Sequence, residues 1–122
     1  MQPVPSFIQI NTIAKYDRHQ AIDDAKRIIQ DSGGWVNDYK MLSNKSICLQ
    51  FEMSQTDAVK LYPDLKQTSL ILYENTEETL QQLTELARQS LLRSDKDLRG
   101  TFQITFVHDE PDLILDVPAF DL

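Results

Sequence analysis

Two segments of this chain alternate between apolar and polar residues, and this alternation constrains the fold more than any other feature. In residues 46–53 the odd-numbered positions are apolar and the even-numbered positions face the other way. Residues 100–106 alternate in the same manner. Because successive side chains of a strand point to opposite faces, each segment predicts a strand with one buried and one exposed face. Such strands are typical of an antiparallel sheet that helices cover on one side only.

The spacing of apolar residues elsewhere predicts three helices and three further strands, in the overall order β-α-β-β-α-β-α-β. The apolar run at residues 69–73 is typical of a short buried strand. Helices are predicted at residues 16–34, 54–66 and 75–94, and strands at residues 6–14, 35–42, 46–53, 69–73 and 100–108.

Residues that begin and end helices support these assignments. Asp17 is a good N-cap for the first helix, with Gln20 three residues later as in a capping box. Gly33 and Gly34 supply the left-handed reversal that stops this helix. Pro63 is predicted to end or interrupt the second helix, and Asn75 can cap the third.

The predicted fold class is therefore α+β, a two-layer sandwich with a mostly antiparallel sheet and helices on one face. A length of 122 residues favours a single domain over residues 1–122, ending in an acidic C-terminal arm at 109–122. The polar face of the sheet either meets water or pairs with another sheet. A homodimer through a sheet edge or through this face is the main alternative to a solvated face.

The charge is negative and concentrated in the second part of the chain. The net charge is −7; residues 1–72 hold eight basic and eight acidic residues, whereas residues 73–122 hold four and eleven. This charge disfavours nucleic acids and anionic membranes as partners. Cys48 is the single cysteine, and the N-terminus lacks the pattern of a secretory signal. A cytoplasmic protein without a membrane span is therefore predicted.

One stretch near the N-terminus resembles a known family. Asp17-Arg18 follow the first predicted strand, and Gly33-Gly34 lie between the first helix and the β-hairpin. In this pattern residues 1–73 resemble a ferredoxin-like module, and more narrowly ACT regulatory domains, whose first loop has the form G-x-D-R-P-G. Ala14-Lys15 and His19-Gln20 depart from that loop. The resemblance implies an oligomeric ligand-sensing or partner-binding module rather than a catalyst.

A ligand site is predicted around the start of the first helix and the hairpin that follows. The free amides of the helix start, with Arg18, can hold an anion. Trp35 can line a pocket between the helix and the sheet. The predicted ligand-binding residues are Asp17, Arg18, His19, Trp35 and Tyr39.

The segment His-Asp-Glu-Pro-Asp at residues 108–112 gathers groups that bind metals or transfer protons. Pro111 indicates that the strand has ended, so the segment is interpreted as a turn. No catalytic residue, metal or cofactor is predicted. The following segment is predicted to be an interaction arm that adds a strand to its own sheet or to a neighbour's edge. The apolar residues of this arm are Leu113, Ile114, Leu115 and Val117.

The leading hypothesis is a non-enzymatic binding or regulatory module that acts through protein–protein or small-ligand contacts as a homo-oligomer. The alternative is a small enzyme with a pocket between sheet and helices. Such a pocket would hold two or more candidate groups within hydrogen-bond reach. The candidates are His19, Asp17, Tyr39 and Cys48.

Overall fold

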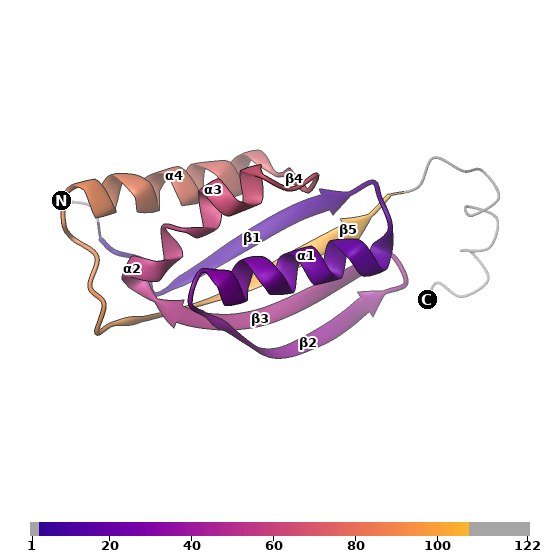
Figure 1. The fold of residues 1–122 in the computed structure, drawn as a ribbon, viewed down its shortest axis with the longest axis horizontal. Helices are drawn as coiled ribbons and strands as arrows, with labels where there is room; N and C mark the ends of the chain where they lie inside the picture. The colour runs from indigo at the N-terminus through magenta and orange to yellow at the C-terminus, as the bar shows by residue number, and fades with distance from the viewer. Residues whose placement is uncertain (1–2, 108–122) are drawn as a thin grey trace.

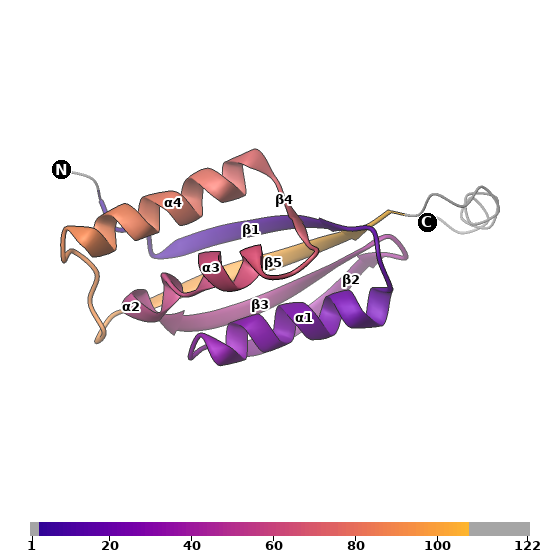
Figure 2. The ribbon, with the colours of Figure 1, turned by 45° about the horizontal axis from the view of Figure 1, so that its top comes forward.

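The computed structural model of the chain describes residues 3–107. These residues form a five-stranded sheet, and Figures 1 and 2 show the helices gathered on one face of it. The predicted two-layer α+β class is confirmed. In chain order the elements are β1 (Phe7–Ala14), α1 (Arg18–Asp31), β2 (Trp35–Ser43), β3 (Ser46–Ser54), α2 (Gln55–Ala58), α3 (Leu61–Lys66), β4 (Ile71–Leu72), α4 (Glu74–Arg88) and β5 (Asp97–Phe106).

The strands lie in the order β2-β3-β5-β1-β4. Three pairings are antiparallel, as predicted, but the central pair is parallel: β1 runs beside β5 over eight residues. The last strand of the described chain therefore lies between β1 and β3. The first and third strands are neighbours in a ferredoxin-like sheet, so residues 1–73 do not form such a sheet by themselves.

The alternating segments bury the faces that their sequences predict. In β3 the odd-numbered residues are at most 3% exposed, and the even-numbered residues of β5 are equally buried. Together with one face of β1 they contact α1, α2 and α4, and the buried residues of α3 belong to the same core cluster. The strand residues of the core are Ile8, Ile10, Ala14, Ile47, Leu49, Phe51, Met53, Leu98, Phe102, Ile104 and Phe106.

The first helix begins and ends close to the predicted positions. The Asp17 carboxylate accepts a hydrogen bond from the Gln20 N–H at 3.0 Å, which confirms the N-cap. The Gln20 side chain donates to Asp24 instead of returning to the cap, so the capping box is not completed. Gly33 has a φ of +100°, a conformation that favours glycine and that stops the helix after Asp31.

The second predicted helix is broken into α2 and α3 at residues 59–60, ahead of Pro63. The Ser54 hydroxyl accepts from the Asp57 N–H at 3.2 Å and caps α2. Pro63 lies in the first turn of α3. The N–H groups of a first turn have no partner within the helix, so the proline costs no helical hydrogen bond there. The interruption is therefore real, but it falls before the proline rather than at it.

The third predicted helix is shorter than expected. α4 has Tyr73 at its N-cap and ends at Arg88, six residues before the predicted end. Ser90 has a φ of +60°, and the Leu91 N–H donates to the Leu86 carbonyl at 3.0 Å. This hydrogen bond closes the helix in a Schellman motif. The prediction that Asn75 caps the helix was wrong.

One further prediction needs correction, and two concern residues outside the described part of the chain. The strand expected at residues 69–73 is reduced to β4, and Ile71 is 43% exposed rather than buried. The predicted turn at 108–112 and the arm at 109–122 lie outside the described residues.

Gly100 is predicted to be essential for the packing of the central strands. A Cβ atom at this position would lie 2.5 Å from Cζ of Phe51 and 2.8 Å from the Ile8 carbonyl oxygen. Because the backbone of β1 cannot move away without breaking its ladder, Gly100→Ala should lower the free energy of unfolding by about 1–3 kcal/mol in urea denaturation. Thr101→Ala, on the uncovered face, should cost less than about 1 kcal/mol. Equal losses for both variants would contradict the steric explanation.

Candidate functional site

Exposed apolar side chains concentrate on β2, which is one edge of the sheet and forms its lower border in Figure 1. Within residues 3–107, seven large apolar side chains are exposed, and four of them belong to β2. The opposite edge, β4, is only two residues long. A long sheet edge with exposed apolar side chains is a surface where another strand can add. The four residues are Trp35, Tyr39, Met41 and Leu42.

The hydrogen bonds at the ends of the β3–β5 ladder show which way the peptide groups of β3 point. The Phe106 N–H donates to the Lys45 carbonyl at 2.7 Å, and the Gln55 N–H donates to the Lys96 carbonyl at 2.9 Å. Hydrogen-bonded pairs alternate along an antiparallel ladder. The odd-numbered residues of β3, such as Leu49, therefore bond to β5, and the even-numbered residues bond to β2.

Tyr39 and Met41 consequently direct their peptide groups away from the sheet. Tyr39 lies opposite Leu49, and Met41 lies opposite Ile47. Leu49 and Ile47 both direct their main-chain hydrogen bonds to β5. Tyr39 and Met41 therefore form non-hydrogen-bonded pairs with β3. The Tyr39 N–H instead donates to the Asp38 carboxylate at 2.8 Å, which agrees with its outward direction.

Irregularities and charges limit what can pair with this edge. Register shifts fall between residues 36 and 38 and between residues 41 and 43, which leaves a regular stretch at residues 38–41. Asp38 and Lys40 lie opposite even-numbered residues of β3 and thus on the uncovered face. Bulges and charged residues on an edge strand oppose indiscriminate strand addition. The edge is thus suited to a strand of complementary charge.

The two aromatic residues of the predicted ligand site point to opposite faces of the sheet. Trp35 lies opposite Glu52 on the uncovered face. Tyr39 lies on the helix-covered face, where the Lys26 Nζ is 5.6 Å from the centroid of its ring. The two residues are four positions apart and would share a face in a regular strand. The register shift after Val36 separates them.

The other predicted ligand-binding residues lie at the start of α1. The Asp17 carboxylate caps the helix. The Arg18 guanidinium donates to the Asn44 carbonyl and lies 4.5 Å from the centroid of the Phe106 ring. Arg18 thus ties the helix start to the hairpin turn and to the end of β5. His19 is exposed. A helix of fourteen residues, about 20 Å long, separates this group from the start of β2.

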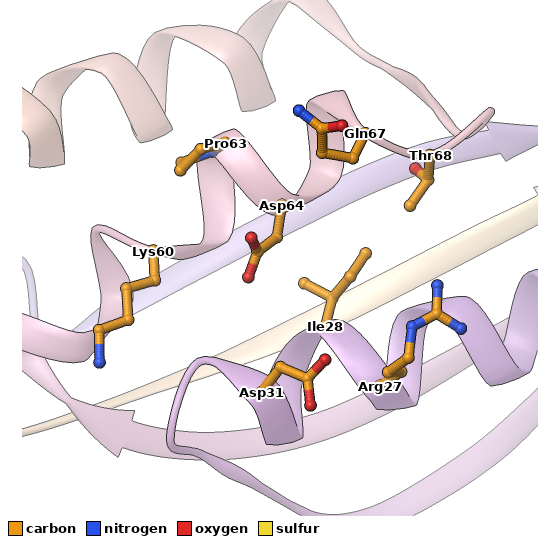
Figure 3. Close-up of a pocket in the computed structure, with 8 residues that line it drawn as sticks. All are labelled: Arg27, Ile28, Asp31, Lys60, Pro63, Asp64, Gln67 and Thr68. Carbon is orange, nitrogen blue, oxygen red and sulfur yellow. The ribbon is translucent and has the colours of Figure 1, made fainter.

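A groove of about 500 Å³ lies between α1 and α3 (Figure 3). Asp31 and Asp64 approach it from opposite sides, and Arg27 and Lys60 bring an equal number of positive charges. No cluster of three or more His, Cys, Asp or Glu side chains within residues 3–107 is placed to hold a metal ion. The groove has no excess of either charge, and none of the predicted ligand-binding residues lines it. Its lining residues are Arg27, Ile28, Asp31, Lys60, Pro63, Asp64, Gln67 and Thr68.

The residues of the enzyme alternative do not converge. Tyr39 lies on the covered face of the sheet, whereas Cys48 lies on the uncovered face opposite Lys40. Tyr39 and Cys48 therefore cannot line one pocket together, and no pocket can hold all four candidate groups. Burial raises the pKa of the Cys48 thiol, and the nearby Lys40 charge offsets this rise only in part. A thiol with a raised pKa is a weak nucleophile at neutral pH.

The structure also contains a buried polar cluster that the sequence analysis missed. Asp24 on α1 is only 7% exposed and accepts hydrogen bonds from Tyr16 Oη, Gln20 Nε2 and Arg27 Nη2 at 2.7, 2.8 and 3.0 Å. Burial by itself raises the pKa of Asp24, but the three donors outweigh it, so the pKa lies below its ordinary value. Burial and the bond to Asp24 raise the pKa of Tyr16.

One signal for this cluster is present in the sequence. Asp24 lies next to Ala25 within the apolar stripe of the helix, with Gln20 and Arg27 at the spacing of helical neighbours. A carboxylate at such a position needs donors if it is buried.

No protein-family model, curated protein or solved structure matches this chain. The resemblance to ACT domains therefore stays a prediction. No helix within residues 3–107 is long and apolar enough to cross a membrane.

We predict that Asp24→Asn lowers the free energy of unfolding at pH 7 by about 1–3 kcal/mol, because charge-assisted hydrogen bonds are lost from a buried site. The pKa of Asp24 is lower in the folded chain than in the unfolded chain. The stabilisation by the Asp24 carboxylate is thus fully present above pH 3.8, the ordinary pKa of aspartate, and is lost as the pH falls through the lowered pKa of the folded chain. The difference between the wild type and the variant should shrink in acid, as measured by urea denaturation at a series of pH values.

The matched control is Asp23→Asn, because Asp23 is the exposed neighbour on the same helix. Its cost should stay below about 0.5 kcal/mol at every pH. A gap between wild type and Asp24→Asn that does not change with pH would argue against the charged cluster.

Cys48 is predicted to react several-fold more slowly with an alkylating reagent in the folded protein than in urea at pH 8. The raised pKa leaves less thiolate, and burial restricts access. Lys40→Ala should slow the folded reaction further, because the Lys40 charge lowers this pKa. A faster reaction in the folded state, measured by mass spectrometry, would contradict the prediction and favour an activated cysteine.

Proposed function

We propose that this protein is a non-enzymatic binding module that accepts a strand from a protein partner along the outer edge of β2. One observation carries the proposal: within residues 3–107, β2 is a nine-residue edge strand that holds four of the seven exposed large apolar side chains. Main-chain hydrogen bonds give such an added strand its affinity, and alternate side chains give it specificity.

The side chains of β2 offer different surfaces on the two faces. On the covered face, Tyr39 and Met41 can extend the apolar layer beneath the helices of the sheet. On the uncovered face, Asp38 and Lys40 present one negative and one positive charge. A partner strand therefore meets an apolar row on one side and an ordered pair of charges on the other.

Met41→Pro tests this function. Proline removes the outward N–H of Met41 and places its ring where a partner strand would approach. Because this N–H does not bond to β3, the ladder inside the protein should survive, as for other prolines on edge strands. We predict that the variant keeps the wild-type circular dichroism spectrum and loses concentration-dependent association in analytical ultracentrifugation.

The matched control is Met41→Thr, which removes the apolar side chain but keeps the N–H. It should weaken association less than proline does. Amide exchange gives an independent reading, since the Met41 N–H should exchange more slowly at high protein concentration. Association that proline leaves intact would show that the edge of β2 is not the binding surface.

A further inference from the structure

We infer that the strand added to β2 is β2 of a second copy of this chain, antiparallel, with Tyr39 opposite Tyr39 of the second copy. This inference rests on the proposed function, because it names the partner of the same edge. The result is a two-fold dimer with one continuous sheet. The helices of both copies lie on the same face of that sheet.

The direction of the peptide groups limits the registers that are possible. Within the regular stretch of residues 38–41, Tyr39 and Met41 point their peptide groups outward. A symmetric ladder must place such residues opposite each other. Three registers satisfy this condition: Tyr39 opposite Tyr39, Tyr39 opposite Met41, and Met41 opposite Met41.

The charges on the uncovered face select among these registers. With Tyr39 opposite Met41, Lys40 would face Lys40 of the second copy, and like charges directly opposite destabilise a ladder. With Met41 opposite Met41, Asp38 moves away from Lys40. Only the register with Tyr39 opposite Tyr39 sets Asp38 against Lys40 of the second copy, and the two-fold axis forms this pair twice.

The same register suits the close contacts of an antiparallel pair. The two Tyr39 residues form the hydrogen-bonded pair, in which each N–H donates to the carbonyl of the other copy. The adjacent pairs of Asp38 and Lys40 are non-hydrogen-bonded, and their side chains approach more closely. The Asp38 carboxylate, which accepts from the Tyr39 N–H in the single chain, releases this donor and turns to Lys40 of the second copy.

On the helix-covered face, the same register brings the two Tyr39 side chains together. Both Tyr39 side chains lie on this face, each beside the Lys26 ammonium of its own copy. Tyr39 is 60% exposed in the single chain, so pairing two such rings removes apolar surface from water. Aromatic pairs across neighbouring strands stabilise a sheet.

Charge reversal tests the register. In D38K the register would place two lysines opposite each other, and in K40D two aspartates. Each single variant should therefore show a dimer dissociation constant at least about tenfold above that of the wild type in analytical ultracentrifugation. An equal mixture of D38K and K40D should form heterodimers with near wild-type affinity, and the double variant D38K/K40D should dimerise like the wild type.

The double variant has the wild-type net charge but lacks the hydrogen bond between the Asp38 carboxylate and the Tyr39 N–H. Its dimerisation therefore shows whether the charge pair across the interface matters, apart from the net charge and apart from that hydrogen bond. D23K and K15D are matched controls, because they change the net charge equally at exposed positions outside β2. Both should dimerise like the wild type.

Cysteine cross-linking reads the register directly. In a C48S background, Tyr39→Cys places two cysteines on the two-fold axis at a Cα separation of about 5.5 Å, which a disulfide can span. Met41→Cys in the same background places them four residues apart along the strands, about 14 Å, which is too far. The first variant should form a disulfide dimer under mild oxidation, and the second should not.

The outcomes separate this inference from the proposed function. Heterodimers no tighter than the single variants, or cross-linking at Met41 but not at Tyr39, would overturn the register. If Met41→Pro still abolished association in that case, the proposed function would stand with another partner strand. A wild-type protein that stays monomeric at about 1 mM would overturn the second copy as the partner.

Discussion

The parallel pairing of β1 with β5 is the interaction on which the rest of this structure depends. It joins residues about ninety positions apart, and it places β5 between the N-terminal strand and the hairpin. Gly100 permits the close approach, because a side chain there would meet Phe51 and the backbone of Ile8. Without β5, the apolar faces of β1 and β3 would have no shared neighbour. The core therefore closes only when residues 97–106 are in place.

This arrangement explains why the two sheet edges differ. In the hairpin of β2 and β3, only β3 pairs with β5. The strand β2 is therefore an edge of the sheet along its full length. On the other side, β4 covers only two residues of β1. Most of the exposed large apolar residues within positions 3–107 lie on the longer edge. The binding surface that we propose is thus a consequence of strand order and not of a separate motif.

Much of the local structure was predictable from the sequence. The strands around residues 46–53 and 100–106 follow from alternation, and the first helix follows from its apolar spacing and the Asp17 cap. The end of α4 was not predictable in this way, since the apolar spacing continues past Arg88 and a Schellman closure at Ser90 ends the helix. The candidate site was predicted only in part. Trp35 and Tyr39 lie on the exposed edge strand, whereas Asp17 and Arg18 make contacts within the fold.

The sequence by itself determined where β3, β5 and the first helix form and which face of each is buried, because these properties depend on local geometry and side-chain periodicity. Tertiary structure alone decided which strand became an edge. It also placed Trp35 and Tyr39 on opposite faces, through a register shift against β3, and buried Asp24 among three donors. The physical reason is the same in each case. Strand order, register and burial depend on pairings between distant segments, and periodicity carries no information about the partner.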